Sequence, residues 1–381
     1  MVKIDTVKGF KDFLGAEARK RVKIKRIIED EFDSFGFEPA ETPIIEFEEF
    51  VSGENSNDEA VRDVYRLEDR AKRKLALRYE FTFQLKRIAK GQKLPYKRYQ
   101  IGSNFRDEPI KKGRLRQFTQ CDCDIIGSTM KDEAEMMVLA KNTLDKLNIE
   151  NTIYFNNRKL LNQILVSEEI EERNREQVIR ELDKLGKLTK AEVAFNLKPL
   201  GAEKLLKKFD EGEKYFEKFK FYEEIKELKE LCKEYGIDIE FSPTLARGLS
   251  YYNGTIFEFW SKDINVSIGA GGSYLINDVQ STGFAFGLEP IFLISNIKEN
   301  NTNFMVLSLE QDKEAVRLTK KLREEGNSVL LMMDKTVKRA MEYANAKGVE
   351  KVVFVGDEEI KSGKFKVKDM LSGEESELVG N

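Results

Sequence analysis

Histidine is absent from the 381 residues of the chain. Its absence excludes a histidine base for nucleophilic catalysis and every zinc site that needs an imidazole ligand. Catalysis must therefore use arginine, carboxylates, hydroxyls, a hard cation such as Mg²⁺, or the substrate itself. Cysteine is scarce as well, with Cys121, Cys123 and Cys232 alone. Because Cys121 and Cys123 lie on the apolar side of a predicted strand, we interpret them as packed thiols and not as a metal pair.

Long apolar runs and a signal-peptide pattern are also missing, so we expect a soluble, cytoplasmic protein. Charged residues make up 35% of the chain, yet the net charge is only -3. This near balance excludes a strongly basic nucleic-acid-binding class, and any RNA surface must be local. The length predicts two or three domains.

The most informative stretch alternates from Tyr99 to Gly127 with a period of two, which predicts two antiparallel strands. Turn residues from Pro109 to Gly113 join them. One predicted face carries cations, carboxylates, amides and one aromatic ring: Gln100, Gly102, Asn104, Arg106, Glu108, Arg114, Arg116, Phe118, Gln120, Asp122 and Asp124. Periodicity alone leaves open an amphipathic hairpin with a solvated face.

The order F-R-D-E, loop, R-L-R-Q-F in this stretch resembles motif 2 of the class II aminoacyl-tRNA synthetases. The resemblance implies that Arg106 holds the α-phosphate of ATP and that Arg114 reaches the γ-phosphate. It also implies that Glu108 accepts from the adenine amino group and that Phe118 stacks on the ring. A planar guanidinium suits a phosphoryl oxygen on which charge develops.

Residues 17–35 have the periodicity of a helix that Gly36 ends, and an extended segment with Pro39 and Pro43 follows. Helix and strand resemble motif 1, the dimer element of the class, so we expect a homodimer. Since proline cannot donate to a central ladder, its strand is predicted at an edge or an interface. An ordinary helix and edge strand would look the same locally.

The segment LALRYEFT (75–82) resembles a block typical of histidyl-tRNA synthetases. Glu80 and Thr82 are two apart on a predicted strand, so we expect them on one face of the amino-acid site. The resemblance implies that Glu80 faces the substrate ammonium group. Tyr79 and Phe81 depart from the family's usual residues.

The segment FSPTLARGLSYYNGTIFEFW (241–260) closely resembles the histidine-binding motif of the same family. The resemblance places Arg247 beside the reacting carboxylate and α-phosphate, and Tyr251 and Tyr252 around the substrate imidazole. Recognition of both ring nitrogens requires a hydroxyl and a carboxylate held in place. Ser250 stands where the family usually has Asp.

Two glycine-containing segments follow. SIGAGGSYL (267–275) resembles the second histidine motif, and we expect a loop in which Gly271 and Gly272 let the backbone approach the substrate. STGFAFGLEPI (281–291) resembles motif 3, so Gly283, Gly287 and Glu289 are expected where a strand opens a helix under the ATP site. Ser273, Leu275 and Pro290 replace Arg, Asp and Arg of the family's motifs, and the last change removes a cation expected on pyrophosphate.

The remaining segments predict three further parts. Residues 128–147 form a helix with a Ser/Thr cap. Lys/Glu-rich helices fill roughly 157–237, as solvated faces or, as in the family, a clasp for the tRNA acceptor stem. After the polar residues 300–303, strands and helices alternate in βαβ order with a mostly parallel sheet, which resembles the family's anticodon-binding domain. Its helices carry cations that suit a phosphate backbone or solvent: Arg317, Lys320, Lys321, Arg323, Lys335, Lys338 and Arg339.

We therefore predict an α+β class II synthetase fold: an antiparallel sheet with flanking helices, a helical insertion and a C-terminal α/β domain. The expected domains are catalytic (1–156 and 239–300), insertion (157–238) and anticodon-binding (301–381). The resemblance implies a ligase that joins histidine to tRNA(His) through an adenylate, using ATP and Mg²⁺. Residues expected around histidine are Glu80, Thr82, Gln120, Asp124, Arg247, Tyr251, Tyr252 and Gly271. Pro290 and Ser273 keep open a non-catalytic, histidine-binding regulator of ATP phosphoribosyltransferase.

Overall fold

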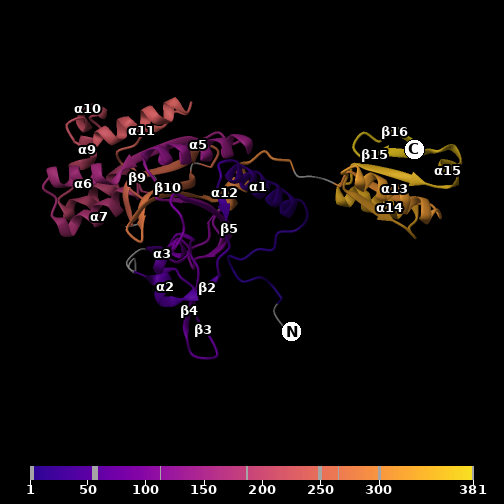
Figure 1. Ribbon diagram of the computed structural model, residues 1–381, viewed down its shortest axis with the longest axis horizontal. Helices are drawn as coiled ribbons and strands as arrows, with labels where there is room; N and C mark the ends of the chain where they lie inside the picture. The colour runs from indigo at the N-terminus through magenta and orange to yellow at the C-terminus, as the bar shows by residue number, and fades with distance from the viewer. Residues whose placement is uncertain are drawn as a thin grey trace. The chain divides into compact units, whose positions relative to one another are not determined.

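The structure is a computed structural model that describes residues 4–53, 59–111, 113–185, 188–247, 251–264, 266–298 and 302–379. The chain divides into two compact units, Met1–Ile297 and Lys298–Asn381 (Figure 1). Ser250 and the start of the polar break at 300–303 lie outside the described residues. Among the helices of the described ranges, none combines the length and apolar character needed to cross a bilayer.

The first unit is built on an eight-stranded sheet in the order β1-β5-β6-β11-β10-β9-β7-β8. Its inner neighbours are antiparallel, and β1–β5 and β7–β8 at the two ends are parallel. The predicted antiparallel sheet is confirmed. Its strands are β1 Glu38–Pro39, β5 Tyr96–Phe105, β6 Gln117–Ile126, β7 Thr152–Asn157, β8 Glu240–Phe241, β9 Tyr252–Ser261, β10 Val266–Ile276 and β11 Val279–Gly287.

The predicted hairpin is confirmed as the antiparallel pair β5–β6. Its connection is longer than the predicted turn, because β5 ends at Phe105 and β6 begins at Gln117. Glu108 and Arg114 therefore lie in the connection and not on a strand. Cys121 and Cys123 are fully buried free thiols on the apolar side, as predicted.

Three helices border the core on that apolar side of the sheet: α1 Gly15–Ser34, α5 Met130–Lys146 and α12 Leu288–Ile294. Ile24, Ile28 and Phe32 of α1 are completely buried in this core. The predicted cap of α5 is present as a capping box between Thr129 and Asp132. The predicted edge strand is β1, which contains Pro39 and ends the sheet order.

A smaller sheet in the order β2-β4-β3 contains the start of the LALRYEFT segment. Its strands are β2 Ile45–Phe47, β3 Arg66–Glu68 and β4 Lys74–Leu77. The same stretch of the chain forms the short helices α2 Glu48–Ser52, α3 Glu59–Arg62, η1 Thr82–Gln84 and α4 Leu85–Ile88. The prediction that Glu80 and Thr82 share a strand is wrong. The ladder ends where Leu77 pairs with Ile45, the first residue of β2, and the chain then buries Phe81 and opens a 3₁₀ turn at Thr82.

Short amphipathic helices fill the region between β7 and β8, as predicted. They are α6 Arg158–Ser167, α7 Glu172–Leu182, α8 Lys190–Leu197, η2 Lys198–Leu200, α9 Leu205–Phe209, α10 Glu213–Phe216 and α11 Tyr222–Glu234. Their buried residues, such as Val178 and Leu228, belong to the same core cluster as the large sheet. A separate insertion domain therefore stays a prediction.

The second unit has a five-stranded sheet in the order β13-β12-β14-β15-β16. Its elements are β12 Phe304–Ser308, α13 Asp312–Glu324, β13 Val329–Met332, α14 Val337–Lys347, β14 Lys351–Val355, α15 Asp357–Ser362, β15 Lys364–Asp369 and β16 Glu375–Val379. The βαβ order is confirmed, but the mostly parallel sheet is wrong. β14, β15 and β16 are antiparallel neighbours because only a short helix and a turn connect them.

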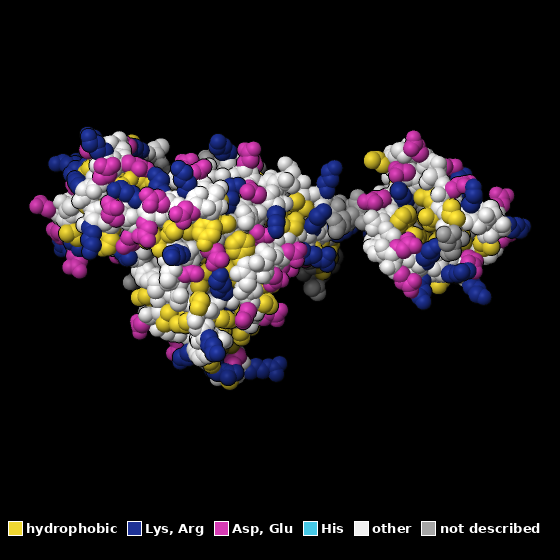
Figure 2. Space-filling view, turned by 45° about the horizontal axis from the view of Figure 1, so that its top comes forward, with side chains coloured by type: hydrophobic (Ala, Val, Ile, Leu, Met, Phe, Trp, Pro, Cys, Tyr) yellow, Lys and Arg dark blue, Asp and Glu magenta, His cyan; other side chains and the backbone are white. Residues whose placement is uncertain are grey.

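The charges of both signs are interspersed over the visible face of each unit (Figure 2). This distribution agrees with the near balance of acidic and basic residues in the sequence. Any surface for a polyanion must therefore be local.

Candidate adenylation site

The β5–β6 register brings polar side chains together on the face of the large sheet that is turned away from α1 and α5. Cross-strand partners on this face are Arg98 with Asp124, Gln100 with Asp122, Gly102 with Gln120, and Asn104 with Phe118. Asn104 donates from Nδ2 to Oε1 of Gln120 at 2.7 Å. Because side chains alternate between the two faces of a strand, the pairing of β5 with β6 places the predicted Phe118, Gln120 and Asp124 on one face.

Arg106 lies just beyond the end of β5 and is held in place by aromatic neighbours. Its guanidinium carbon lies 5.1 Å from the centre of the Phe118 ring and 5.9 Å from that of Tyr79. Its Nε donates to the Tyr79 carbonyl at 3.1 Å. The other two predicted nucleotide residues lie in the same connection, where Arg114 Nη1 is 3.7 Å from the Glu108 carboxylate. The structure thus pairs Arg106 with Phe118, and Arg114 with Glu108.

Glu289 lies elsewhere, with partners on the helix-covered side of the sheet. Arg21 of α1 contacts its carboxylate at 2.9 Å, and the Thr119 backbone N–H donates to it at 3.0 Å. Both side chains of the ion pair are nearly buried. Glu289 thus connects α1 and α12 to β6, and its role at ATP stays a prediction.

We expect Glu289→Ala to lower the free energy of unfolding by about 3 kcal/mol, because Arg21 would keep a buried charge without its partner. The KM for ATP should stay within about twofold of the unaltered protein. Urea unfolding and ATP titration in one preparation measure both quantities. Glu108→Ala is the matched control, for which we expect a higher KM for ATP at nearly unchanged stability. A raised KM for ATP without loss of stability in Glu289→Ala would restore the nucleotide role.

Three tyrosines gather beside the polar face. The ring centre of Tyr251 is 4.8 Å from that of Tyr252 and 5.5 Å from that of Tyr274, and the latter two are 6.4 Å apart. Burial, and after it the nearby Glu80 carboxylate, raises the pKa of Tyr251 well above its usual range. Glu80 is itself buried. Glu80 therefore lies within electrostatic reach of Tyr251 and Tyr252, whereas Thr82 opens the helical turn η1.

Tyr274 was missed by the sequence reasoning, although it lies within SIGAGGSYL. Its hydroxyl donates to Oδ1 of Asp124. The expected loop is wrong, because 267–275 is part of strand β10. A bulge between Gly272 and Tyr274 shifts the register with β9, which a motif comparison does not reveal.

Strand glycines leave the space that the larger side chains fill. A methyl group on Gly272 would lie 2.8 Å from the ring of Tyr252, and one on Gly102 would lie 2.9 Å from Nη2 of Arg78. A methyl group on Gly271 would lie on the opposite face of the sheet, against Phe257 and Phe284 in the core. Of the two predicted glycines, Gly272 makes room on the tyrosine side and Gly271 on the core side.

Arg247 lies in the left-handed backbone region, with φ of +47°. It forms an ion pair with Glu258, which also accepts from Nε1 of Trp260 at 2.7 Å. Burial alone lowers the pKa of Arg247, but the Glu258 carboxylate raises it to a higher net value. Tyr252 contributes in the same direction, which places Arg247 within electrostatic reach of the tyrosines.

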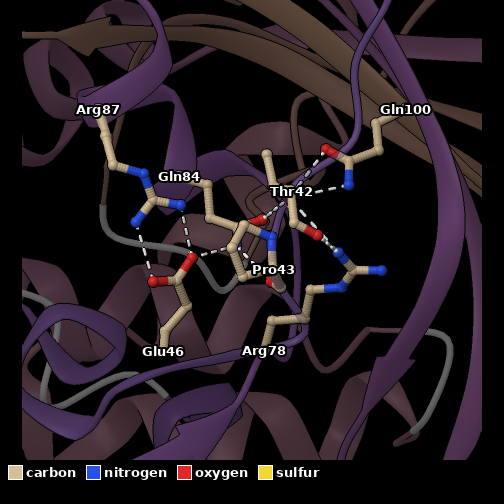
Figure 3. Close-up of polar contacts among 7 residues, drawn as sticks. All are labelled: Thr42, Pro43, Glu46, Arg78, Gln84, Arg87 and Gln100. Atoms are coloured by element: carbon tan, nitrogen blue, oxygen red, sulfur yellow. Dashed lines mark hydrogen bonds and ion pairs between the residues drawn. The ribbon is translucent and has the colours of Figure 1, made fainter.

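A polar network lies against the polar face of β5 (Figure 3). Arg78 donates to the carbonyls of Thr42 at 2.7 Å and Ser103 at 2.9 Å. The Thr42 hydroxyl bonds to Gln100 and Gln84, and the Gln84 amide donates to Glu46 at 2.6 Å. These bonds fix the segment after β1 against the polar face of β5. Within the described ranges, no three His, Cys, Asp or Glu side chains cluster as a metal site would require.

Two protein families match the chain, and the boundary between the matches lies close to the boundary between the two compact units. Residues 9–291 match a family model described as histidyl-tRNA synthetase, and residues 293–379 match one described as an anticodon binding domain. The chain is 34% identical to histidine–tRNA ligase 1 of Bacillus cereus over 98% of its length and 97% of that protein. It is 32% identical to histidine–tRNA ligase 2 of Shouchella clausii, covering 98% and 97%.

Two solved structures share the fold. A histidyl-tRNA synthetase from Nostoc superposes with a TM-score of 0.86 at 24% identity, covering 100% of this chain and 97% of that one. A protein from Bacillus halodurans, described as an ATP phosphoribosyltransferase regulatory subunit/histidyl-tRNA synthetase, superposes with a TM-score of 0.80 at 20% identity, covering 93% and 99%. The predicted class II fold is confirmed.

Proposed function

The chain belongs to the histidyl-tRNA synthetase family, and we propose that it activates histidine with ATP and transfers it to the 3′ end of tRNA(His). The observation that carries this proposal is the juxtaposition on one sheet face of an arginine over an aromatic ring and a cluster of tyrosines and carboxylates. Arg106 with Phe118 suits a nucleotide, and Tyr251, Tyr252 and Glu80 suit a cationic amino acid.

In the proposed reaction, a carboxylate oxygen of histidine attacks the α-phosphorus of ATP. The bond to the bridging oxygen breaks, and pyrophosphate leaves with that electron pair. Because the nucleophile is already an anion, no protein base is needed, which agrees with the absence of histidine. Arg106 stabilises the charge that develops on the α-phosphate, and its contacts with Tyr79 and Phe118 keep it oriented beforehand.

The amino-acid side of the proposed site uses Glu80 for the ammonium group and Tyr251 with Tyr252 as walls for the imidazole. Gln120 and Asp124 lie on the same strand face and supply polar contacts to the ring. Arg247 is proposed beside the reacting carboxylate, where Glu258 keeps its charge and orientation.

We propose that Mg²⁺ enters with ATP. It typically binds through substrate phosphates with one or two carboxylates. The described residues hold no prebuilt cluster for the ion, so no step is assigned to it. When bound, it would offset the charge of pyrophosphate.

The second unit is proposed to bind the anticodon region of tRNA(His), since it matches an anticodon binding domain. A homodimer is proposed as well. Its support is an exposed apolar group on the edge strand β2 and just before it, where Ile44, Ile45 and Phe47 are 45%, 49% and 51% exposed. We further propose that the protein works in the cytoplasm.

Histidine-dependent exchange of labelled pyrophosphate into ATP tests the proposal. We expect exchange with histidine and none without it, followed by charging of tRNA(His). Histidine binding without exchange, in a folded protein, would favour the regulator, for which Pro290 in place of the motif 3 Arg is the specific observation. Pro290 lies beside the hairpin connection, since its Cα is 3.8 Å from where a Gly113 methyl would be.

A further inference from the structure

Arg98 is a fully buried arginine on the polar face of β5, with a side chain that is 0% exposed. It directly precedes the stretch from Tyr99 to Gly127 that resembles motif 2. A buried charge is costly unless an opposite charge compensates it. Its Nη2 lies 2.7 Å from Oδ2 of Asp124, its cross-strand partner. Within the described part of the chain, no N–H of Arg98 is aligned for a hydrogen bond, so this ion pair is its described polar contact.

Each oxygen of the Asp124 carboxylate has its own polar partner. Arg98 lies against Oδ2, and the Tyr274 hydroxyl donates to Oδ1. The carboxylate extends over Gly283 of the neighbouring strand β11, where a methyl group would lie 2.7 Å from its carbon. Two strands on opposite sides of β6 therefore determine where this carboxylate points.

Asp122, two residues earlier on the same face, has a different environment. Its Oδ1 is buried without a hydrogen-bond partner among the described residues. Burial raises its pKa well above the usual range, Arg98 opposes the shift, and Asp124 and Glu80 add to it. The pKa of Asp124 is raised as well, with burial as the main cause, but Arg98 and the Tyr274 hydroxyl oppose the rise. The buried Arg98 guanidinium thus opposes the rise in pKa of both carboxylates, and it contacts Asp124.

We propose that Arg98 is a positioning residue for histidine recognition, which keeps Asp124 ionised and oriented as an acceptor for a ring N–H of the substrate. The guanidinium contacts Asp124, whereas Oδ1 of Asp122 has no hydrogen-bond partner among the described residues, so the charge of Arg98 acts most directly on Asp124. The inference rests on the proposed function, because it gives Asp124 its imidazole contact. Without the guanidinium, the buried Asp124 would take up a proton and lose much of its strength as an acceptor.

The test compares Arg98→Met with Lys97→Met in histidine-dependent pyrophosphate exchange. Lys97 is the matched control, since it is the adjacent β5 cation and pairs with Glu135 at the same 2.7 Å, but on the helix-covered face. We expect Arg98→Met to raise the KM for histidine at least tenfold, with the KM for ATP within twofold. Lys97→Met should leave both values within twofold.

The pH dependence of the KM for histidine distinguishes a positioning role of Arg98 from a role in folding alone. Groups that face Asp124 are Arg98 from β5, Asp122 from β6, Tyr252 from β9 and Tyr274 from β10. Loss of Arg98 raises the pKa of Asp124, so more of it is neutral at low pH. The ratio of the histidine KM of Arg98→Met to that of the unaltered protein should therefore fall from pH 6 to pH 9. Titration of free histidine cancels in this ratio.

Equal histidine KM values in Arg98→Met and the unaltered protein, or a ratio that does not change with pH, would overturn the positioning role. If Arg98→Met does not fold, Arg98→Lys decides: at least a threefold rise in the KM for histidine supports the proposal, and the unaltered value overturns it. If the unaltered protein shows no exchange, the proposed function fails instead. The two failures are thus distinguishable.

Discussion

Arg106→Ala is expected to reduce histidine-dependent pyrophosphate exchange by about 10³-fold, the usual scale for loss of a preorganised group at developing charge. Arg106 is half-buried, and its guanidinium lies over Phe118 with Nε bonded to the Tyr79 carbonyl. These contacts hold it without a carboxylate partner in the described ion pairs, so its charge remains available to a phosphate. The loss should appear in kcat, because the charge it opposes develops in the transition state.

The control for this prediction is Arg66→Ala. Arg66 belongs to the same unit and pairs with Glu48 at 2.8 Å, but its side chain is 48% exposed. We expect its exchange rate to stay within about twofold, as for most surface pairs. Both variants should unfold near the temperature of the unaltered protein. Exchange retained by a folded Arg106→Ala would remove Arg106 from the catalytic assignment.

Gly283→Ala is expected to lower kcat/KM for histidine by about 100-fold, a loss typical of a misplacement near 1 Å in a site. A methyl group there would overlap Oδ1 of Asp124 and lie 2.8 Å from the Cys123 carbonyl oxygen. Since the backbone of a central strand cannot move aside, the Asp124 side chain must leave its position between Arg98 and Tyr274. Overpacking should also lower the free energy of unfolding by about 1–3 kcal/mol.

Gly254→Ala is the matched control, because Gly254 is a strand glycine whose added methyl would lie 3.3 Å from its nearest neighbour, Cβ of Ser273. We expect a change of less than threefold in kcat/KM for histidine. Steady-state exchange and thermal unfolding measure both variants. An unchanged KM for histidine in Gly283→Ala would show that the position of Asp124 does not matter for recognition.

Much of the fold follows from local patterns. The period of two between Tyr99 and Gly127 predicted β5 and β6, and the Thr129 cap predicted the start of α5. The predicted ATP residues of the hairpin, such as Arg106 and Phe118, also came together. Such predictions succeed because alternation in a strand and capping of a helix depend on residues only a few positions apart.

Other predictions depended on partners far along the chain. Glu80 and Thr82 lie outside β4 because this strand ends at Leu77, whose partner Ile45 is the first residue of the neighbouring strand β2. No pattern within 75–82 encodes that boundary. Glu289 pairs with Arg21, which is 268 residues away in the sequence. A family resemblance names the residues of a motif but does not state which contacts they make.

The amino-acid sequence by itself determined the α+β class, the family and the strand face on which Gln120 and Asp124 lie. Tertiary structure alone decided that Arg98 and Tyr274 hold Asp124 and that Gly283 makes room for it. The reason is physical: side-chain direction within a strand is set by the local backbone, whereas the neighbour across the sheet is set by register between distant segments. Only that register brings a buried charge to its partner.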